Sequence, residues 1–244
     1  MEGKKHLLIL ILLVFIEMIA EASYKKEIYN AFITGDMVKW KKIIDNLDKQ
    51  PGKSDQLYLE LLEYQYGYIA YCIGNKKDDQ AKYYYEKGKT IINQLEKKGY
   101  ELAKIYAYKS AFYGFAIGFK PYQAPILGPK SIYYARESVK VDTANPNGYT
   151  LLGHIKYYMP VVFGGSKKEA VDYYRKAEAL MESQAGGVKE DWNYIGILTT
   201  IAVAYSEIED YNHAQFYFDK ILKFEPELYW VKNELYPEFL KKIK

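Results

Sequence analysis

The chain has few of the residues from which disulfides, metal sites and nucleic-acid contacts are built. Cys72 is its one cysteine, so an internal disulfide is excluded and the fold must be held by packing. Three histidines are too few for a histidine-rich metal site, and Cys72 has no second cysteine for a zinc site. Arginine occurs only at 136 and 175, which leaves few of the bidentate forks that suit nucleic acid. We therefore expect no metal, no cofactor and no nucleic-acid partner.

The apolar run near the amino terminus is too short for an ordinary membrane span. Lys4 and Lys5 precede it, it covers residues 7–16, and Ala20-Glu21-Ala22 supplies small residues at signal-peptidase spacing. The alternative is a single membrane anchor, but the run is about half the roughly 20 residues a span needs, and Glu17 interrupts it. We predict a signal peptide over 1–22 and an exported domain over 23–244 that has no membrane span. The periplasm is the expected compartment, with an extracellular location as the alternative.

The remaining sequence favours helices, and one stretch near the carboxyl end indicates how they pair. Small and aromatic residues recur there at helical spacing on both sides of a turn near 209–210, and a proline follows the second helix. Small residues let two backbones approach while aromatics fill the space around the contact. The pattern predicts an antiparallel helical hairpin whose packing residues are Ala202, Tyr205, Tyr211, Ala214, Phe218 and Pro226.

This stretch, residues 195–228, resembles a tetratricopeptide repeat, although Leu198 stands where the repeat usually has tryptophan and Glu209 where it has the turn glycine. Weaker versions of the pattern precede it. We therefore predict an all-α fold of stacked antiparallel helical hairpins, a right-handed solenoid like that of tetratricopeptide repeats, with a carboxyl-terminal capping helix. The expected hairpins cover about 24–50, 57–98, 99–143, 147–184 and 188–225, and the cap covers 226–244. The run 145–170 also resembles exported repeat proteins of Bacteroidota-type bacteria.

Two segments are predicted as loops that join the helices within neighbouring hairpins. Residues 120–129 and 157–165 both contain proline, and they carry apolar side chains at Ile126, Leu127, Val161, Val162 and Phe163. Such residues either seal the edge of the stack or contact a ligand or partner. Asn145 and Ser166 are predicted helix N-caps, Ser166 in a capping box with Glu169.

No nucleophile, base or metal set can be assembled at a spacing suited to catalysis, so we expect a protein that is not an enzyme. The resemblance to tetratricopeptide repeats implies a concave face built from first helices that receives a protein or peptide segment. It carries over to Thr150, His154, Tyr157, Tyr158, Thr199, Val203, Ser206 and Glu207. The alternative is a periplasmic small-ligand binder resembling the repeat subunit associated with some transporters. That reading predicts a large closed cavity near Phe112, Phe119, Tyr157 and Phe163.

Overall fold

The structure is a computed structural model that describes residues 24–243, and every regular element within that range is helical. The predicted signal peptide, 1–22, lies outside the described residues. An opening helix over 24–34 is followed by α2 (Met37–Lys49), α3 (Asp55–Gly74), α4 (Asp78–Lys98), α5 (Leu102–Phe119), α6 (Ala124–Val141), α7 (Pro146–Tyr158), α8 (Lys167–Glu182), α9 (Trp192–Glu207), α10 (Tyr211–Phe224) and α11 (Tyr236–Lys242). Short 3-10 turns, η1 (Pro121–Gln123) and η2 (Val161–Phe163), precede α6 and α8.

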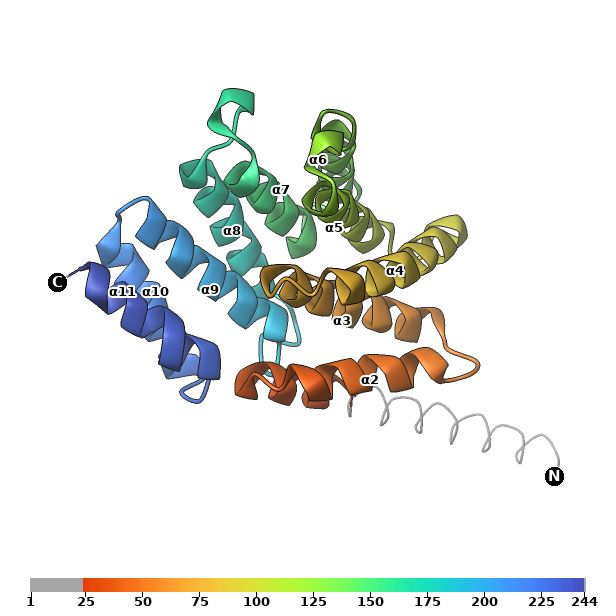
Figure 1. Cartoon of the computed structure of the whole chain (residues 1–244), viewed down its shortest axis with the longest axis horizontal. Coiled ribbons are helices and arrows are strands. Elements are labelled where there is room, and N and C mark those ends of the chain that lie inside the picture. The colour runs from red at the N-terminus through yellow and green to blue at the C-terminus, as the bar shows by residue number, and fades with distance from the viewer. Residues whose placement is uncertain (1–23, 244) are drawn as a thin grey trace.

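The helices pack in consecutive pairs, which confirms the prediction of stacked hairpins (Figure 1). Within the last pair, Ala202 of α9 and Ala214 of α10 are fully buried, and Tyr205 and Phe218 are buried beside them. Tyr211 is half-buried and lies against Phe239 of α11, with ring centroids 6.3 Å apart. Pro226 is exposed in the turn after α10. The small-and-aromatic alternation therefore marks the contact between paired helices.

Local hydrogen bonds explain where several helices begin. The Asn145 side chain accepts from the backbone N–H of Asn147 at 3.0 Å, and Pro146 is the first residue of α7. The Ser166 hydroxyl accepts from the backbone N–H of Glu169 at 3.2 Å at the start of α8. Both predicted caps are confirmed. Glu209, in the turn between α9 and α10, adopts a φ of 63°, in the left-handed region that glycine prefers.

The predicted loop over 120–129 is too long. The segment 120–129 is not all loop, because α6 already begins at Ala124 and contains both Pro125 and Pro129. Pro125 stands in the first turn, where its missing N–H costs no helical hydrogen bond. Pro129 lies inside the helix and does not end it. The carboxyl-terminal cap is helical, but a π-helical turn, η3 (Val231–Leu235), precedes α11.

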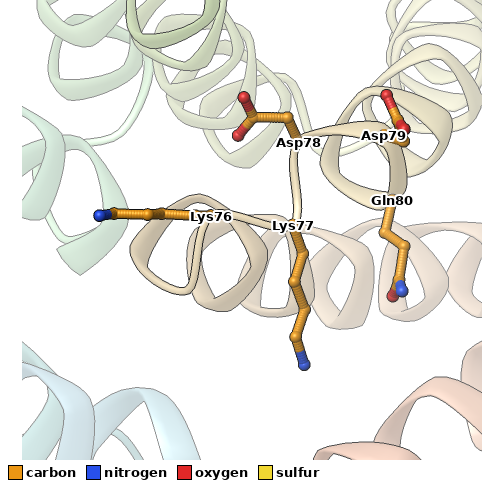
Figure 2. A pocket seen from close by; sticks show the side chains of 5 residues that line it. All are labelled: Lys76, Lys77, Asp78, Asp79 and Gln80. Carbon is orange, nitrogen blue, oxygen red and sulfur yellow. The ribbon is translucent and has the colours of Figure 1, made fainter.

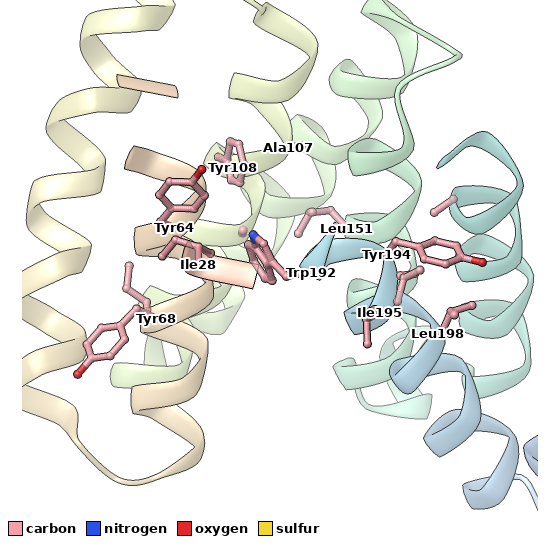
Figure 3. Packing of buried hydrophobic residues seen from close by; sticks show 14 of the residues in the cluster. Ile28, Tyr64, Tyr68, Ala107, Tyr108, Leu151, Trp192, Tyr194, Ile195 and Leu198 are labelled. Carbon is pink, nitrogen blue, oxygen red and sulfur yellow. The ribbon is translucent and has the colours of Figure 1, made fainter. Parts of the chain in front are cut away.

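The opening hairpin does not stand free at one end of the stack; it packs against the later hairpins (Figure 1). Trp192, the first residue of α9, places its ring 5.0 Å from that of Trp40 on α2 and 6.0 Å from that of Phe32 on the opening helix. Figure 3 shows Trp192 between Ile28 and Leu151, side chains that come from early and late parts of the chain. The Tyr29 hydroxyl donates to Glu225 at 2.7 Å, beyond the end of α10. The first and last hairpins of the stack are therefore in contact, an arrangement that we call the closure of the stack.

Candidate functional site

The predicted groove residues of α7 and α9 come together across two neighbouring hairpins. The Tyr157 hydroxyl donates to the Glu207 carboxylate, which also pairs with Lys167 at 3.0 Å. Tyr158 lies beside both Tyr157 and His154, with ring centroids 4.8 and 6.2 Å apart. Residues that the resemblance assigned to two separate hairpins therefore lie next to each other.

Other predicted groove residues are less accessible. Thr199 and Ser206 are buried, and the Thr199 hydroxyl donates to the Ile195 carbonyl at 2.8 Å within its own helix. Thr150 is half-buried and donates to the Pro146 carbonyl at 3.1 Å. Val203 is half-buried. Tyr158 and Glu207 are exposed, so a partner at this face would meet these two residues first.

Two aromatic side chains that sequence reasoning did not assign to the groove extend it toward the start of the chain. Tyr66 of α3 and Phe115 of α5 have ring centroids 5.6 Å apart. Helix α5 packs against both α3 and α7, so these two residues come from the helices that precede α7 in the stack. Burial raises the pKa of Tyr66, and the Tyr158 phenol adds to the shift. We call the set Tyr66, Phe115, His154, Tyr158 and Glu207 the inner face. Its members come from α3, α5, α7 and α9, each the first helix of its hairpin.

The inner face carries one carboxylate and one neutral histidine. Although burial works in the opposite direction, hydrogen bonds from Tyr157 and Lys167 lower the pKa of Glu207, so it is ionised at neutral pH. Burial lowers the pKa of His154 to about 4, and its Nδ1 is 2.9 Å from the Tyr174 hydroxyl. His154 is therefore uncharged at neutral pH.

The shift at His154 predicts a loss of stability in acid. The histidine binds a proton below about pH 6.5 in the unfolded chain but only below about 4 in the folded chain. Stability from this residue is therefore complete above pH 6.5 and is lost as the pH falls toward 4, by about 2–3 kcal/mol. Urea unfolding of the wild type and of His154→Gln at pH 7 and pH 4.5 isolates the effect, since other titrating groups are common to both. Equal pH dependence in the two proteins would contradict the assignment.

A second polar cluster lies where α3 meets α9. The Glu63 carboxylate accepts from the Asn193 amide at 2.8 Å and from the Tyr108 hydroxyl at 3.3 Å. Burial, with the negative charge of Asp191 nearby, raises the pKa of Glu63 to about 7. The pKa of Asp191 is also raised by burial. The hydrogen bond between Glu63 and Asn193 joins segments 130 residues apart in sequence and belongs to the closure of the stack.

The two predicted loops do not seal the edge of the stack. Val161, Val162, Phe163 and Ile126 are all exposed, and Leu127 is half-buried. Side chains that stand in solvent cannot close an apolar edge. Contact with a ligand or partner is the interpretation that stays open for these loops.

Two hollows in the described part of the chain lie away from the inner face, and neither is lined by the residues of the closed cavity expected near Phe112, Phe119, Tyr157 and Phe163. One is at the turn between α3 and α4, where the side chains of residues 76–80 point in different directions (Figure 2). The other, of about 530 Å³, is open to solvent between α8 and α10 and is lined by Arg175, Tyr217 and Lys220 among others. Across residues 24–243, no group of three or more histidine, cysteine or acidic side chains could hold a metal ion.

Comparisons with known proteins give a fold and no family. No family model matches the chain, and no curated protein matches it. Among solved structures, the HusA haemophore from Porphyromonas gingivalis is similar, with a TM-score of 0.56 and 16% sequence identity. The match covers 74% of this chain and 92% of that one, and at this identity it shows the fold alone. In residues 24–243 no helix is long and apolar enough to cross a membrane.

Proposed function

We propose that this chain is an exported, non-enzymatic binding scaffold that receives its partner on the inner face. The observation that carries the proposal is the meeting of Tyr157, Tyr158 and Glu207 from separate hairpins, next to aromatic side chains of α3 and α5. Tyr158 is exposed and the aromatic side chains around it are half-buried, so they offer contact area at low entropic cost, and the hydroxyls and carboxylate beside them fix orientation. These groups suit binding, and they lack the nucleophile and base pair that catalysis would use.

The first candidate partner is a peptide or protein segment. The inner face runs across four first helices, so it offers an extended surface rather than an enclosed pocket. An extended segment can place alternate side chains against Tyr66, Phe115 and Tyr158 while its backbone groups bond to hydroxyls and to Glu207. A single negative charge paired with Lys167 favours a segment with little net charge.

A second candidate is a small apolar ligand of the haem class, favoured by the similarity in fold to a haemophore. Haem combines a flat aromatic macrocycle with carboxylates. Tyr66, Phe115 and Tyr158 could stack on such a ring, and His154 or Tyr158 could approach its iron. Titration of the purified domain with haemin, followed by absorbance, separates this candidate from the first.

Removal of two aromatic side chains from the inner face is expected to abolish capture. His154→Ala with Tyr158→Ala should reduce at least about tenfold the amount of the specific partner that immobilised protein retains from native envelope extract, because both rings lie in the contact. Quantitative mass spectrometry identifies the retained species, and direct binding to the purified partner follows.

The matched control is His213→Ala with Tyr83→Ala, which removes an exposed histidine and an exposed tyrosine from second helices. It should retain the wild-type profile. If the inner-face variant also retains every species, and neither protein binds haemin, the inner face is not the binding surface.

A further inference from the structure

Five apolar side chains project from two turns of the stack, and the function proposed for the inner face does not use them. Tyr122, Ile126, Val161, Val162 and Phe163 are between 67% and 86% exposed. We call this set the turn patch. Scattered single apolar residues are normal on a protein surface, but a group of this size has a reason to avoid water.

The two turns lie at one edge of the molecule. Tyr122 belongs to η1 between α5 and α6, Ile126 lies in the first turn of α6, and the other three form η2 between α7 and α8. Because α5 and α7 are first helices of neighbouring hairpins and contact each other, their carboxyl ends face the same way. Figure 1 shows the turn between α7 and α8 projecting at the upper edge of the view, where the α5 and α6 pair also ends.

Positive charge predominates around the turn patch. Residues 102–136 and 143–168 contain no aspartate or glutamate. Lys120 in the turn before η1, Lys130 on α6 and Lys168 at the start of α8 are all exposed. Two further lysines at this edge are paired with acids, Lys156 with Glu169 in the first turn of α8 and Lys167 with Glu207 at the end of α9. The patch therefore presents apolar tips among lysines, the combination that anionic lipid headgroups attract.

The shape of the patch favours a flat partner. Its side chains are exposed on two turns and at the start of α6, and none of them lines either of the two hollows described above. A peptide or small ligand needs a groove, whereas a bilayer needs projecting side chains that enter the interface. We propose that the turn patch docks this protein on an anionic phospholipid surface, with Val161, Val162 and Phe163 inserted at headgroup depth and the lysines against phosphate.

Sedimentation with lipid vesicles tests this directly. The purified domain should bind vesicles of phosphatidylglycerol and phosphatidylcholine, and it should bind pure phosphatidylcholine at least about tenfold more weakly. The triple variant Val161→Ser, Val162→Ser, Phe163→Ser should lose at least about tenfold in partition to the anionic vesicles. The charge variant Lys120→Gln, Lys130→Gln, Lys168→Gln should lose a similar factor, and about 1 M salt should weaken wild-type binding.

A matched control uses α2, where Val38 is 82% exposed and Lys39 and Lys42 are exposed. Val38→Ser, Lys39→Gln, Lys42→Gln should bind vesicles like the wild type. The inner-face variant should do the same, so failure of one proposal is distinguishable from failure of the other. Three results overturn lipid docking: no wild-type binding to anionic vesicles, unchanged binding by the triple variant, or a patch-dependent dimer in light scattering that identifies a second copy as the occupant.

Discussion

Trp192→Ala is expected to lower the free energy of unfolding by about 3–5 kcal/mol, the range for loss of a large buried aromatic side chain. Trp192 is 8% exposed and touches Trp40 and Phe32. A Cβ added at Gly67 of α3 would lie 2.8 Å from the Trp192 ring, so the ring also packs directly on the α3 backbone. Its removal leaves a cavity where the opening hairpin, α3 and α9 meet. Urea unfolding followed by circular dichroism measures the loss.

Trp230→Ala is the control for that variant. Trp230 is 47% exposed near the carboxyl-terminal cap, and its removal should cost less than about 1 kcal/mol. Trp192→Ala should also increase the radius of gyration in small-angle X-ray scattering as the opening hairpin separates from α9. A loss no larger than that of the control, with unchanged dimensions, would show that the ring does not hold the two parts together.

Gly153→Ala is expected to destabilise the protein by about 1–3 kcal/mol, although alanine is the better helix former. A Cβ at Gly153 would lie 2.4 Å from the ring of Tyr174. Tyr174 is fully buried, so its ring has no free space into which it can move. The contact between α7 and α8 must widen to accept one methyl group. Thermal and urea unfolding give the change in stability.

Gly196→Ala provides the matched control, since Gly196 also lies inside a first helix but a Cβ there would meet nothing within 4 Å. This variant should be more stable than the wild type by about 0.5–1 kcal/mol, because only the helix propensity changes. If both glycine variants stabilise the protein, close packing at Gly153 is not the reason for its glycine.

The sequence contained enough to predict the hairpins because their determinants are local. Gly153 against Tyr174 and Ala202 near Ala214 follow from helical spacing, and the caps at Asn145 and Ser166 follow from side-chain chemistry next to a helix start. The closure was not predictable in this way. Trp40 and Trp192 lie far apart in the chain, and no periodic pattern indicates that their rings meet.

The candidate site was predictable in part for the same reason. Fixed positions within two repeats placed Tyr157 and Glu207 on adjacent first helices, where they form a hydrogen bond. The pattern could not say that Thr199 and Ser206 would be buried, because burial depends on how neighbouring hairpins tilt. Nor could the pattern assign Tyr66 and Phe115 to the inner face, because the stretches of sequence around them match it less well.

Contact between the opening hairpin and α9 also decides how the chain denatures. In an open row of hairpins each unit touches only its neighbours, so the outermost units can fray while the middle survives. Here Trp192 and the hydrogen bond between Tyr29 and Glu225 tether the earliest helices to the latest ones. Neither the earliest nor the latest hairpin can then unfold without loss of these contacts, and we expect the domain to unfold in a single cooperative transition.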